Sequence, residues 1–285
     1  MYLQCKVLKV SSAGYYKWRS AAQNDKQLKD QSLIDLIQVL HKESFGAYGI
    51  RRIVRELKRQ GIIVNQKRIR RLMKFLGIQG KNAPKKRYIA TTDSNHTNPI
   101  AENHLNRQFV QGAPNIAWVS DITYVWTESG WLYLAVVIDL FSRMVVGWAT
   151  GAHITASLIC LALQKAVVKR NPPSGLLLHS DRGVQYTSEQ YRLMVGKYGI
   201  IQSMSRRANC WDNSVAESFF RSLKVEALKG YTFHTRGDAE SRIFKYIEGF
   251  YNQRRAHSFL QYLTPMQFEL SGVTHRTSKI VKATR

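Results

Sequence analysis

Three acidic residues occupy positions from which carboxylates can act together. Asp121 lies within an apolar, β-rich run, Asp181 directly follows a second such run, and Glu217 stands near the start of a helical pattern. In mixed and parallel sheets the strand carboxyl ends gather at a crevice, to which a neighbouring helix adds a side chain. We expect the three carboxylates to converge there as a hard-oxygen site for Mg²⁺ or Mn²⁺. Because such a cluster is costly without a cation, the triad and the metal imply each other.

Glu217 also has a purely structural interpretation. Ser214-x-x-Glu217 fits the S/T-x-x-E capping box that opens a helix, and apolar residues follow it at helical spacing. Capping boxes are common and carry no chemistry. Read locally, this interpretation is the favoured one, so the rest of the chain must decide.

The segments around the acids predict a mixed α/β sheet. The runs "IAWVSDITYVW", "WLYLAVVIDL" and "MVVGWAT" are β-rich and separated by turns, which is typical of an antiparallel meander. Helix, strand, helix, strand and helix are then expected in the order 154–170, 175–181, 188–199, 200–205 and 213–230. The order βββαβαβα indicates a five-stranded mixed sheet flanked by helices. Further helices are expected from residue 237 onward.

The N-terminal region predicts three helices and a basic surface. Apolar residues recur at helical spacing in 26–43, 48–61 and 64–77, with Asn65 as an N-cap and Gly61 and Gly77 as helix ends. Such a unit resembles a helix-turn-helix, and its last helix has a cationic face. A merely solvated charged face is the alternative, and the lack of interleaved acids favours DNA contact. The expected contact residues are Lys67, Arg68, Arg70, Arg71 and Lys74.

The charge of the chain indicates a polyanionic partner. Forty-three Lys and Arg against nineteen Asp and Glu give +24, of which residues 1–100 contribute +15 and residues 101–285 contribute +9. Nucleic acid is favoured over a membrane, because the basic segments are not paired with exposed aromatic or acyl-anchoring features. No apolar run is long enough to span a bilayer, and we see no export signal. Three scattered cysteines exclude a disulfide framework. A cytoplasmic protein, on the nucleoid when bound to DNA, fits best.

These patterns divide the chain into four regions. We expect a helical DNA-binding region at 1–79, with its helix-turn-helix-like part at 26–79, and a basic linker at 80–110. The catalytic core follows at 111–230 and a C-terminal helical extension at 231–285. The linker lacks periodicity and offers Lys85, Lys86 and Arg87 to phosphates.

The spacing of the three acids and the sequence motifs around them resemble those of a known protein family. Fifty-nine residues separate Asp121 from Asp181 and thirty-five separate Asp181 from Glu217, similar to the D,D(35)E pattern of transposases and retroviral integrases. Five segments look like parts of the second-frame (OrfB) transposase of the IS-three family of bacterial insertion sequences. They are "WVSDITYV", "VIDLFSRMVVGW", "HSDRGVQYTS", "CWDNSVAESFFRSLK" and "YNQRRAHSFLQYLTP". "GYYKWR" and "YGIRRI" resemble its N-terminal part. The resemblance implies a ribonuclease-H-like core.

The resemblance also implies an activity. The family cleaves and joins DNA strands at the ends of an insertion sequence, by metal-dependent hydrolysis and then transesterification. With two ions per active site, Asp121 is expected to bridge them, while Asp181 and Glu217 each hold one. The implied partners are the terminal inverted repeats and target DNA, further copies of the chain in an end-bridging complex, and the first-frame (OrfA) protein or a fusion with it. No zinc is expected, because no HxxxH partnered with CxxC is present.

Other residues near the triad have expected supporting roles. Arg221 and Lys224 follow Glu217 on one helical stripe, where the family has basic residues that grip DNA ends; an ion pair of Arg221 with Glu217 is the structural alternative. His179 and Ser180 are expected to orient Asp181 through hydrogen bonds.

Three further points stay open from the sequence. Asp139 reads as a turn residue or a support for the site, and Asp212 as a loop or N-cap residue. Ala208 stands where the family pattern leads us to expect glycine. Two alternative functions also remain, a catalytically incompetent DNA-binding regulator and a nuclease of the same fold that only hydrolyses.

Overall fold

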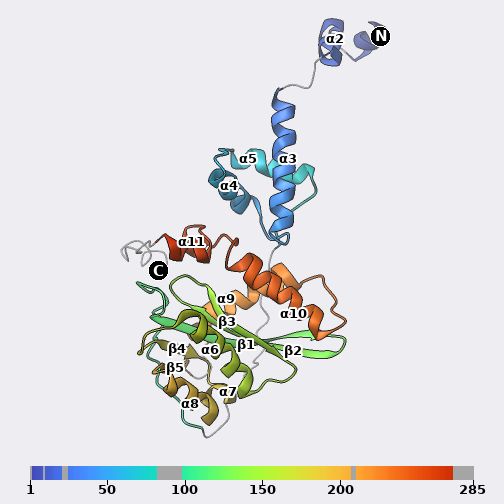
Figure 1. The fold of residues 1–285 in the computed structure, drawn as a ribbon. Coiled ribbons are helices and arrows are strands. Elements are labelled where there is room, and N and C mark those ends of the chain that lie inside the picture. The colour runs from blue at the N-terminus through green and yellow to red at the C-terminus, as the bar shows by residue number, and fades with distance from the viewer. Residues whose placement is uncertain (1, 9, 21–24, 82–97, 207–209, 272–285) are drawn as a thin grey trace. The chain divides into compact units, whose positions relative to one another are not determined.

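The computed structural model describes residues 2–8, 10–20, 25–81, 98–206 and 210–271 (Figure 1). The chain divides into two compact units, Met1–Gly80 and Lys81–Arg285. Each unit has its own buried residues.

The first unit is helical throughout its described part. Its elements are α1 (Tyr2–Val7), α2 (Ser12–Ser20), α3 (Asp25–Glu43), α4 (Ile50–Arg59) and α5 (Gln66–Phe75). The three helices expected between residues 26 and 79 are confirmed as α3, α4 and α5. Sequence patterning did not single out α1 and α2.

A small apolar core holds α3, α4 and α5 together. Ile37, Ile53, Leu57 and Ile69 are fully buried, and they recur at the helical spacing that predicted the three elements. Asn65 caps α5 as expected, because its side chain accepts a hydrogen bond from the backbone N–H of Lys67.

Glycines end α4 and α5 as predicted. Gly61 and Gly77 have φ angles of 80° and 65°, in the left-handed region that favours glycine at a helix C-terminus. The two turns after α4 and α5 therefore depend on residues without a Cβ.

A five-stranded mixed sheet forms the centre of the second unit. Its strands are β1 (Ala117–Thr127), β2 (Gly130–Asp139), β3 (Val145–Gly151), β4 (Leu177–Ser180) and β5 (Ile201–Met204). They lie in the order β3-β2-β1-β4-β5. The first three form the predicted antiparallel meander, and β4 and β5 run parallel to β1. The predicted ribonuclease-H-like order βββαβαβα is confirmed.

One face of the sheet is covered by α6 (Ala156–Arg170), α7 (Val184–Thr187) and α8 (Glu189–Lys197). Apolar side chains of these helices and of the strands form one continuous core. The packing of α6 on β3 is close, since a Cβ on Gly147 would lie 2.4 Å from the carbonyl oxygen of Ala162. A glycine is therefore needed on the strand at that crossing.

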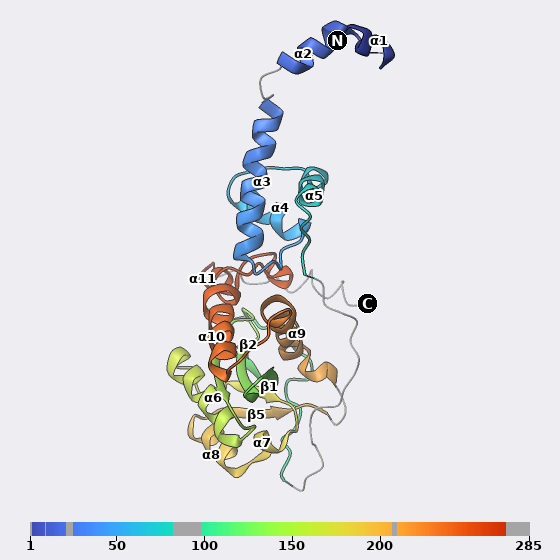
Figure 2. The same cartoon turned by 90° about the vertical axis from the view of Figure 1, so that its right-hand side faces the viewer.

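The other face carries the helices that follow β5. Figures 1 and 2 show α9 (Ser214–Leu223) and α10 (Arg236–Phe244) on the opposite side of the sheet from α6 and α8. Each continues into a π-helical segment, Lys224–Leu228 after α9 and Lys245–Tyr251 after α10. The short helix α11 (Pro265–Leu270) comes last among the described elements.

The segment "YNQRRAHS" holds the C-terminal helices on the core. Tyr251 is buried with its ring edge-on to Phe219. The Asn252 amide bonds both the backbone N–H and the carbonyl of Val145, each at 3.0 Å, on the edge strand β3. Buried Arg255 pairs with Glu226 through two hydrogen bonds of 2.7 Å. All three of these side chains are therefore part of the packing between the C-terminal helices and the sheet.

Part of the predicted linker lies on the second unit. Leu105 is buried and its N–H bonds the Ser203 hydroxyl, while Asn98 bonds Thr187. Residues within 98–110 therefore contact α7 and β5 of the second unit. Lys85, Lys86 and Arg87 fall outside the described residues, as does Ala208.

Candidate active site

The pairing of β1 with β4 brings Asp121 and Asp181 to one place on the sheet. The two strands are parallel, with Ala117, Trp118 and Val119 opposite residues sixty positions later in the chain. Asp121 and Asp181 have the same sixty-residue offset, and Asp181 directly follows the last residue of β4. The charge of Asp181 acts on Asp121, which indicates that the two aspartates lie near each other.

Glu217 reaches the site from α9, which contacts β1. The helix begins at Ser214 after Asn213, and this N-cap makes no side-chain capping hydrogen bond. The capping-box interpretation of Ser214 and Glu217 is therefore wrong. The carboxylate in the first turn of α9 is not accounted for by helix capping.

The charges of the three acids act on one another. The Asp121 pKa is raised well above its usual value, first by burial and then by the negative charges of Asp181 and Glu217. The N–H of Ile122 and the positive charge of Lys224 oppose this rise in the pKa of Asp121. The charges of Asp181 and Glu217 thus act on Asp121, and the convergence of the three carboxylates on a metal ion stays a prediction.

Backbone hydrogen bonds fix the two aspartates. One oxygen of Asp121 accepts the N–H of Ile122 at 2.8 Å, and one oxygen of Asp181 accepts the N–H of Gly183 at 3.0 Å. As the side chains stand, no three Asp, Glu, His or Cys residues of the described chain surround a point that would hold a metal ion. The donor set is nevertheless all carboxylate, the chemistry that Mg²⁺ and Mn²⁺ prefer.

A buried tyrosine lies next to the two aspartates, and sequence reasoning missed it. The hydroxyl groups of Tyr186 and Ser120 are hydrogen-bonded at 3.0 Å, directly before Asp121 in β1. The Tyr186 pKa is raised well above its usual value by burial and then by the charges of Asp121, the neighbouring Tyr191 and Asp181. The available signal was its place in "HSDRGVQYTS", five residues after Asp181.

His179 does not have the role predicted for it. Its two ring nitrogens lie 2.9 Å from the Ser203 hydroxyl and 3.1 Å from the Ser205 hydroxyl, so neither is left for Asp181. Burial lowers the His179 pKa to about 4, which keeps the ring neutral at pH 7. His179 therefore joins β4 to the end of β5.

Ser180 acts on Asp181 only through the backbone. Its hydroxyl donates a hydrogen bond of 3.0 Å to the backbone carbonyl of Asp181. The carboxylate of Asp181 is instead held by Gly183. Orientation of the Asp181 carboxylate by Ser180, which we had expected, is not what the structure shows.

Asp139 is a buried turn residue. Its carboxylate accepts hydrogen bonds from the N–H groups of Asn115 and Phe141, each at 2.8 Å, and from the Trp118 indole at 3.3 Å. Arg170 lies 3.4 Å away and also pairs with Glu269. Of the two roles considered for Asp139, these contacts match the turn.

Asp212 is neutralised by arginines. Arg206 and Arg107 reach one carboxylate oxygen at 2.9 and 2.8 Å, and these contacts hold the Asp212 pKa well below its usual range. The residue lies in the 3₁₀ turn Cys210–Asn213 before α9. An acid paired in this way is poorly suited to replace Glu217 as a metal ligand.

Lys224 borders the acid cluster, as its helical offset from Glu217 predicted. Partial burial lowers the Lys224 pKa, and the charge of Asp121 opposes that shift. Its ammonium nitrogen lies 5.0 Å from the centre of the Tyr124 ring. Arg221 is exposed on the same helix.

The basic face of α5 is only partly free for DNA. Arg68 and Arg71 bond the carboxylate of Asp30 on α3, at 2.7 and 2.5 Å. The α5 sequence contains no acidic residue, and Asp30 of α3 supplies the negative charge that pairs with these two arginines. Lys67, Arg70 and Lys74 are exposed.

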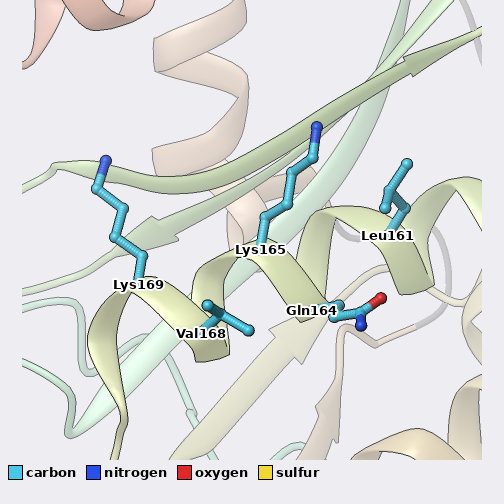
Figure 3. A pocket seen from close by; sticks show the side chains of 5 residues that line it. All are labelled: Leu161, Gln164, Lys165, Val168 and Lys169. Atoms are coloured by element: carbon cyan, nitrogen blue, oxygen red, sulfur yellow. The ribbon is translucent and has the colours of Figure 1, made fainter.

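A shallow hollow on the outer face of α6 is separate from these acids. Figure 3 shows the side chains that line it, which are Leu161, Gln164, Lys165, Val168 and Lys169. None of them is a carboxylate, and the hollow contributes nothing to the candidate active site.

Within the described residues, no helix has the length and apolar character needed to cross a membrane.

Family models match three segments of the chain. Residues 27–87 match an HTH-like domain, and residues 111–210 and 217–271 match the Integrase core domain. The chain resembles several solved structures, among them a simian T-cell lymphotropic virus intasome (15% identity, TM-score 0.47, 83% of this chain and 74% of that one). It also resembles the catalytic core domain of BIV integrase (22% identity, TM-score 0.43, 55% and 95%). A third is the HTLV-2 integrase catalytic core domain in complex with magnesium (18% identity, TM-score 0.42, 55% and 97%).

Curated relatives match almost end to end. An "Insertion element IS600 uncharacterized 31 kDa protein" of Shigella sonnei is 44% identical, over 93% of this chain and 96% of the relative. The "Transposase InsF for insertion sequence IS3A" of Escherichia coli strain K12 is 39% identical, over 93% and 92%. The chain therefore belongs to the family of the InsF transposases of IS3 insertion sequences.

Proposed function

We propose that the chain is a transposase that cleaves and joins DNA strands at insertion-sequence ends, with Asp121, Asp181 and Glu217 as its catalytic residues. The observation that carries this proposal is the cluster itself. Asp121, on the central strand β1, has its pKa raised first by desolvation and then by the charges of two further carboxylates, Asp181 directly after β4 and Glu217 on α9. Glu217 lies in the first turn of α9, which contacts β1, the strand that carries Asp121.

The donor chemistry fits Mg²⁺ or Mn²⁺, two ions per active site, held by the same three carboxylates. Such ions activate the attacking oxygen and stabilise the leaving oxygen of a phosphodiester. Binding requires the three side chains to turn toward a common point, since they do not surround one as placed. Asp121 stands between the other two in the network of charges and is the proposed shared ligand.

Protein groups around the cluster position DNA and keep charges in place. Lys224 offers a cation to a phosphate next to the acids, and exposed Arg221 extends this surface. Neutral His179 and the Ser120–Tyr186 pair fix the two strands that carry the aspartates. These residues act on orientation and on the phosphate charge.

The first unit is the proposed site for the terminal repeats. Lys67, Arg70 and Lys74 are exposed on α5, and phosphate contacts of this kind make DNA affinity fall steeply with salt. Arg68 and Arg71 would have to leave Asp30, or share it, to bind phosphate. Lys85, Lys86 and Arg87 remain proposed contacts from sequence alone.

Assembly and partners are proposed by family likeness. One relative is named an InsF transposase and one solved neighbour an intasome. We propose that copies of the chain bridge the two element ends, and that a first-frame protein or fusion supplies further end recognition. Target DNA is the second substrate, and the proposed place of action is the bacterial nucleoid.

A strand-joining assay tests the function. Labelled element-end DNA and a target plasmid are incubated with Mn²⁺ and full-length protein, with and without the first-frame protein. The wild type is compared with Asp181→Asn and with Glu240→Gln, whose exposed acid bonds Thr150 away from the cluster. We expect joined strands from wild type and Glu240→Gln and none from Asp181→Asn.

The same assay separates the alternatives. Nicked DNA without joined strands from the wild type would identify a hydrolysis-only nuclease. Bound but unreacted DNA under both conditions would identify a DNA-binding regulator, and equal products from wild type and Asp181→Asn would exclude catalysis by the cluster.

A further inference from the structure

Three aromatic side chains are exposed at the far end of the β1–β2 hairpin. Tyr124, Trp126 and Trp131 keep 38%, 58% and 42% of their surfaces accessible. Residues that alternate with them, such as Val125 and Leu132, are buried. The rings therefore stand together on one face of the hairpin, and the residues between them bury against the other.

The rings contact one another edge to face. Trp126 is paired across the strands with Trp131, with ring centres 4.8 Å apart and planes at 72°. Tyr124 is a diagonal neighbour of Trp131, at 5.0 Å and 85°. Cross-strand aromatic pairs stabilise a hairpin. Stabilising the hairpin does not require the three rings to keep 38–58% of their surfaces accessible. The accessible ring surface is therefore available to a ligand.

The hairpin is held in place by the loop before α10. The N–H of Glu128 donates to the carbonyl of Phe233, and the Arg236 guanidinium donates to the carbonyl of Trp131, both at 2.9 Å. Within the turn, the Thr127 hydroxyl bonds the carbonyl of Gly130 at 2.6 Å. A ligand that stacks on these rings would therefore meet a surface ordered beforehand.

The aromatic surface and the acid cluster share the strand β1. Tyr124 follows Asp121 by three residues, roughly 10 Å along the strand, and this odd separation points the two side chains to opposite faces of β1. Lys224 connects the two places, since its ammonium nitrogen lies 5.0 Å from the Tyr124 ring centre and its charge acts on Asp121. In the described residues β4 pairs with β1 only at Ala117–Val119, so the strand edge toward Tyr124 is not covered by β4.

Aromatic faces beside cations match the chemistry of an unpaired nucleic acid strand. Bases stack on the rings while cations hold the phosphates, and such stacking tolerates any sequence. A second copy of this chain is a poorer match, because residues 101–285 carry +9 and Lys224 and Arg236 border the patch. Fully paired DNA is also a poorer match, since its base faces are hidden in the stack.

We propose that Tyr124, Trp126 and Trp131 form a platform on which unpaired bases of a DNA strand stack, next to the phosphodiester held at the acid cluster. The proposal rests on the proposed function and adds the state of the substrate, a strand opened beside the reacting phosphate. Opening a duplex costs a few kcal/mol, which stacking on the rings would offset.

Binding in the absence of metal tests the platform separately from catalysis. Fluorescence anisotropy in EDTA measures the affinity of the full chain for a labelled oligothymidine and for a duplex of equal length. We expect Trp126→Ala to weaken single-strand binding about 5-fold to 100-fold and to leave duplex binding nearly unchanged. Trp126→Phe, which keeps a ring, should retain most of the single-strand affinity.

Phe244→Ala is the matched control, because this ring is 55% exposed on α10 and contacts Trp148 rather than the hairpin. Equal single-strand losses in Trp126→Ala and Phe244→Ala would overturn the platform, as would a parallel loss of duplex binding. A change of oligomeric state in Trp126→Ala alone would show that the patch is a protein interface. Thermal unfolding checks that each variant is folded.

Photocrosslinking of the unaltered protein gives a second test that needs no variant. An oligonucleotide carrying 5-iododeoxyuridine reacts with aromatic side chains that stack on it. Mass spectrometry should find the crosslink in a peptide containing residues 124–131, and crosslinks confined to other peptides would contradict the platform. Normal strand joining with either negative result would overturn the platform and leave the transposase proposal intact.

Discussion

Carboxylates of the second unit fall into two groups that differ in the charges around them. Glu226 accepts two hydrogen bonds from Arg255 and one from Tyr246, and Asp212 is bonded by Arg206 and Arg107. Asp121 is instead surrounded by two further acids, with Lys224 as the opposing charge. The negative charges of the first, compensated group are balanced by arginines of the same unit. Around Asp121 the negative charges outnumber the positive one.

This difference gives a criterion for assigning a catalytic role to an acid near the site, which is that its carboxylate is not already paired with cations of the protein. Asp212 is close to Glu217 in sequence, but its arginine partners lower its pKa and occupy its oxygens. Asp121 has its pKa raised by burial and by like charges, which is the signature of a site built for a cation. The predictions below test whether this division holds.

The largest expected effect comes from one member of the acid cluster. Asp181→Asn should reduce strand joining on the order of a thousand-fold or more, because charge stabilisation at the reacting phosphate is lost. The melting temperature without metal should stay the same or rise, since a repulsion with Asp121 is removed. Joined product is measured on gels and unfolding by scanning calorimetry; a destabilised variant would place Asp181 in the compensated group.

The compensated group should give the opposite pattern. Glu226→Gln should destabilise the protein by about 3–5 kcal/mol, because buried Arg255 loses its charge partner. Replacing Glu226 and Arg255 together with methionines should recover much of that loss. Urea unfolding measures both. A double variant no more stable than Glu226→Gln would show that the ion pair is not the source of the effect.

The two groups should also respond to pH with opposite signs. Because the folded pKa of Asp121 is raised, its ionisation costs stability as pH rises above about 4, up to the folded value. Without metal, the unfolding free energy of Asp121→Asn should therefore increase relative to that of wild type as the pH rises above about 4 toward the raised pKa of Asp121.

Asp212 has a lowered pKa, so it contributes stability above about pH 4 that is lost as the pH falls toward its folded value. The advantage of wild type over Asp212→Asn should shrink in that acid window. Urea unfolding at a series of pH values measures the unfolding free energy of both variants relative to wild type. If this difference changed with pH in the same direction for Asp121→Asn and Asp212→Asn, the division into two groups would be wrong.

The smallest effect is expected at an acid of the first unit. Asp30→Asn releases Arg68 and Arg71 on a solvent-facing side of α5, so stability should change little and the change should fade with salt. DNA affinity at low salt should rise, because two cations are freed for phosphate. Anisotropy titrations at stepped salt measure it; reduced affinity would mean that Asp30 positions the arginines for DNA.

Sequence patterning predicted the sheet well because its signals are local. The three β-rich runs and the alternating elements after them follow from periodicity, and the sixty-residue offset of Asp121 and Asp181 equals the observed strand register. Asn65 and Gly77 were equally readable, since a cap or a left-handed turn depends on a single residue.

Contacts between distant segments could not be predicted in the same way. Asp30 on α3 bonds arginines of α5 about forty residues later in the chain. Glu226, in the first π-helical segment, bonds Arg255, which follows the second. His179 faces β5, which its place beside Asp181 in the sequence did not show. A charge or ring on one segment does not indicate which other segment will compensate it.

Calorimetric titration of Mn²⁺ into the full-length protein would show directly whether the three carboxylates share a cation. Wild type and Glu240→Gln should bind with the same affinity, while Asp121→Asn, Asp181→Asn and Glu217→Gln should each lose most of the binding heat. Unchanged Mn²⁺ affinity in these three variants, all folded, would contradict a common metal site at Asp121, Asp181 and Glu217.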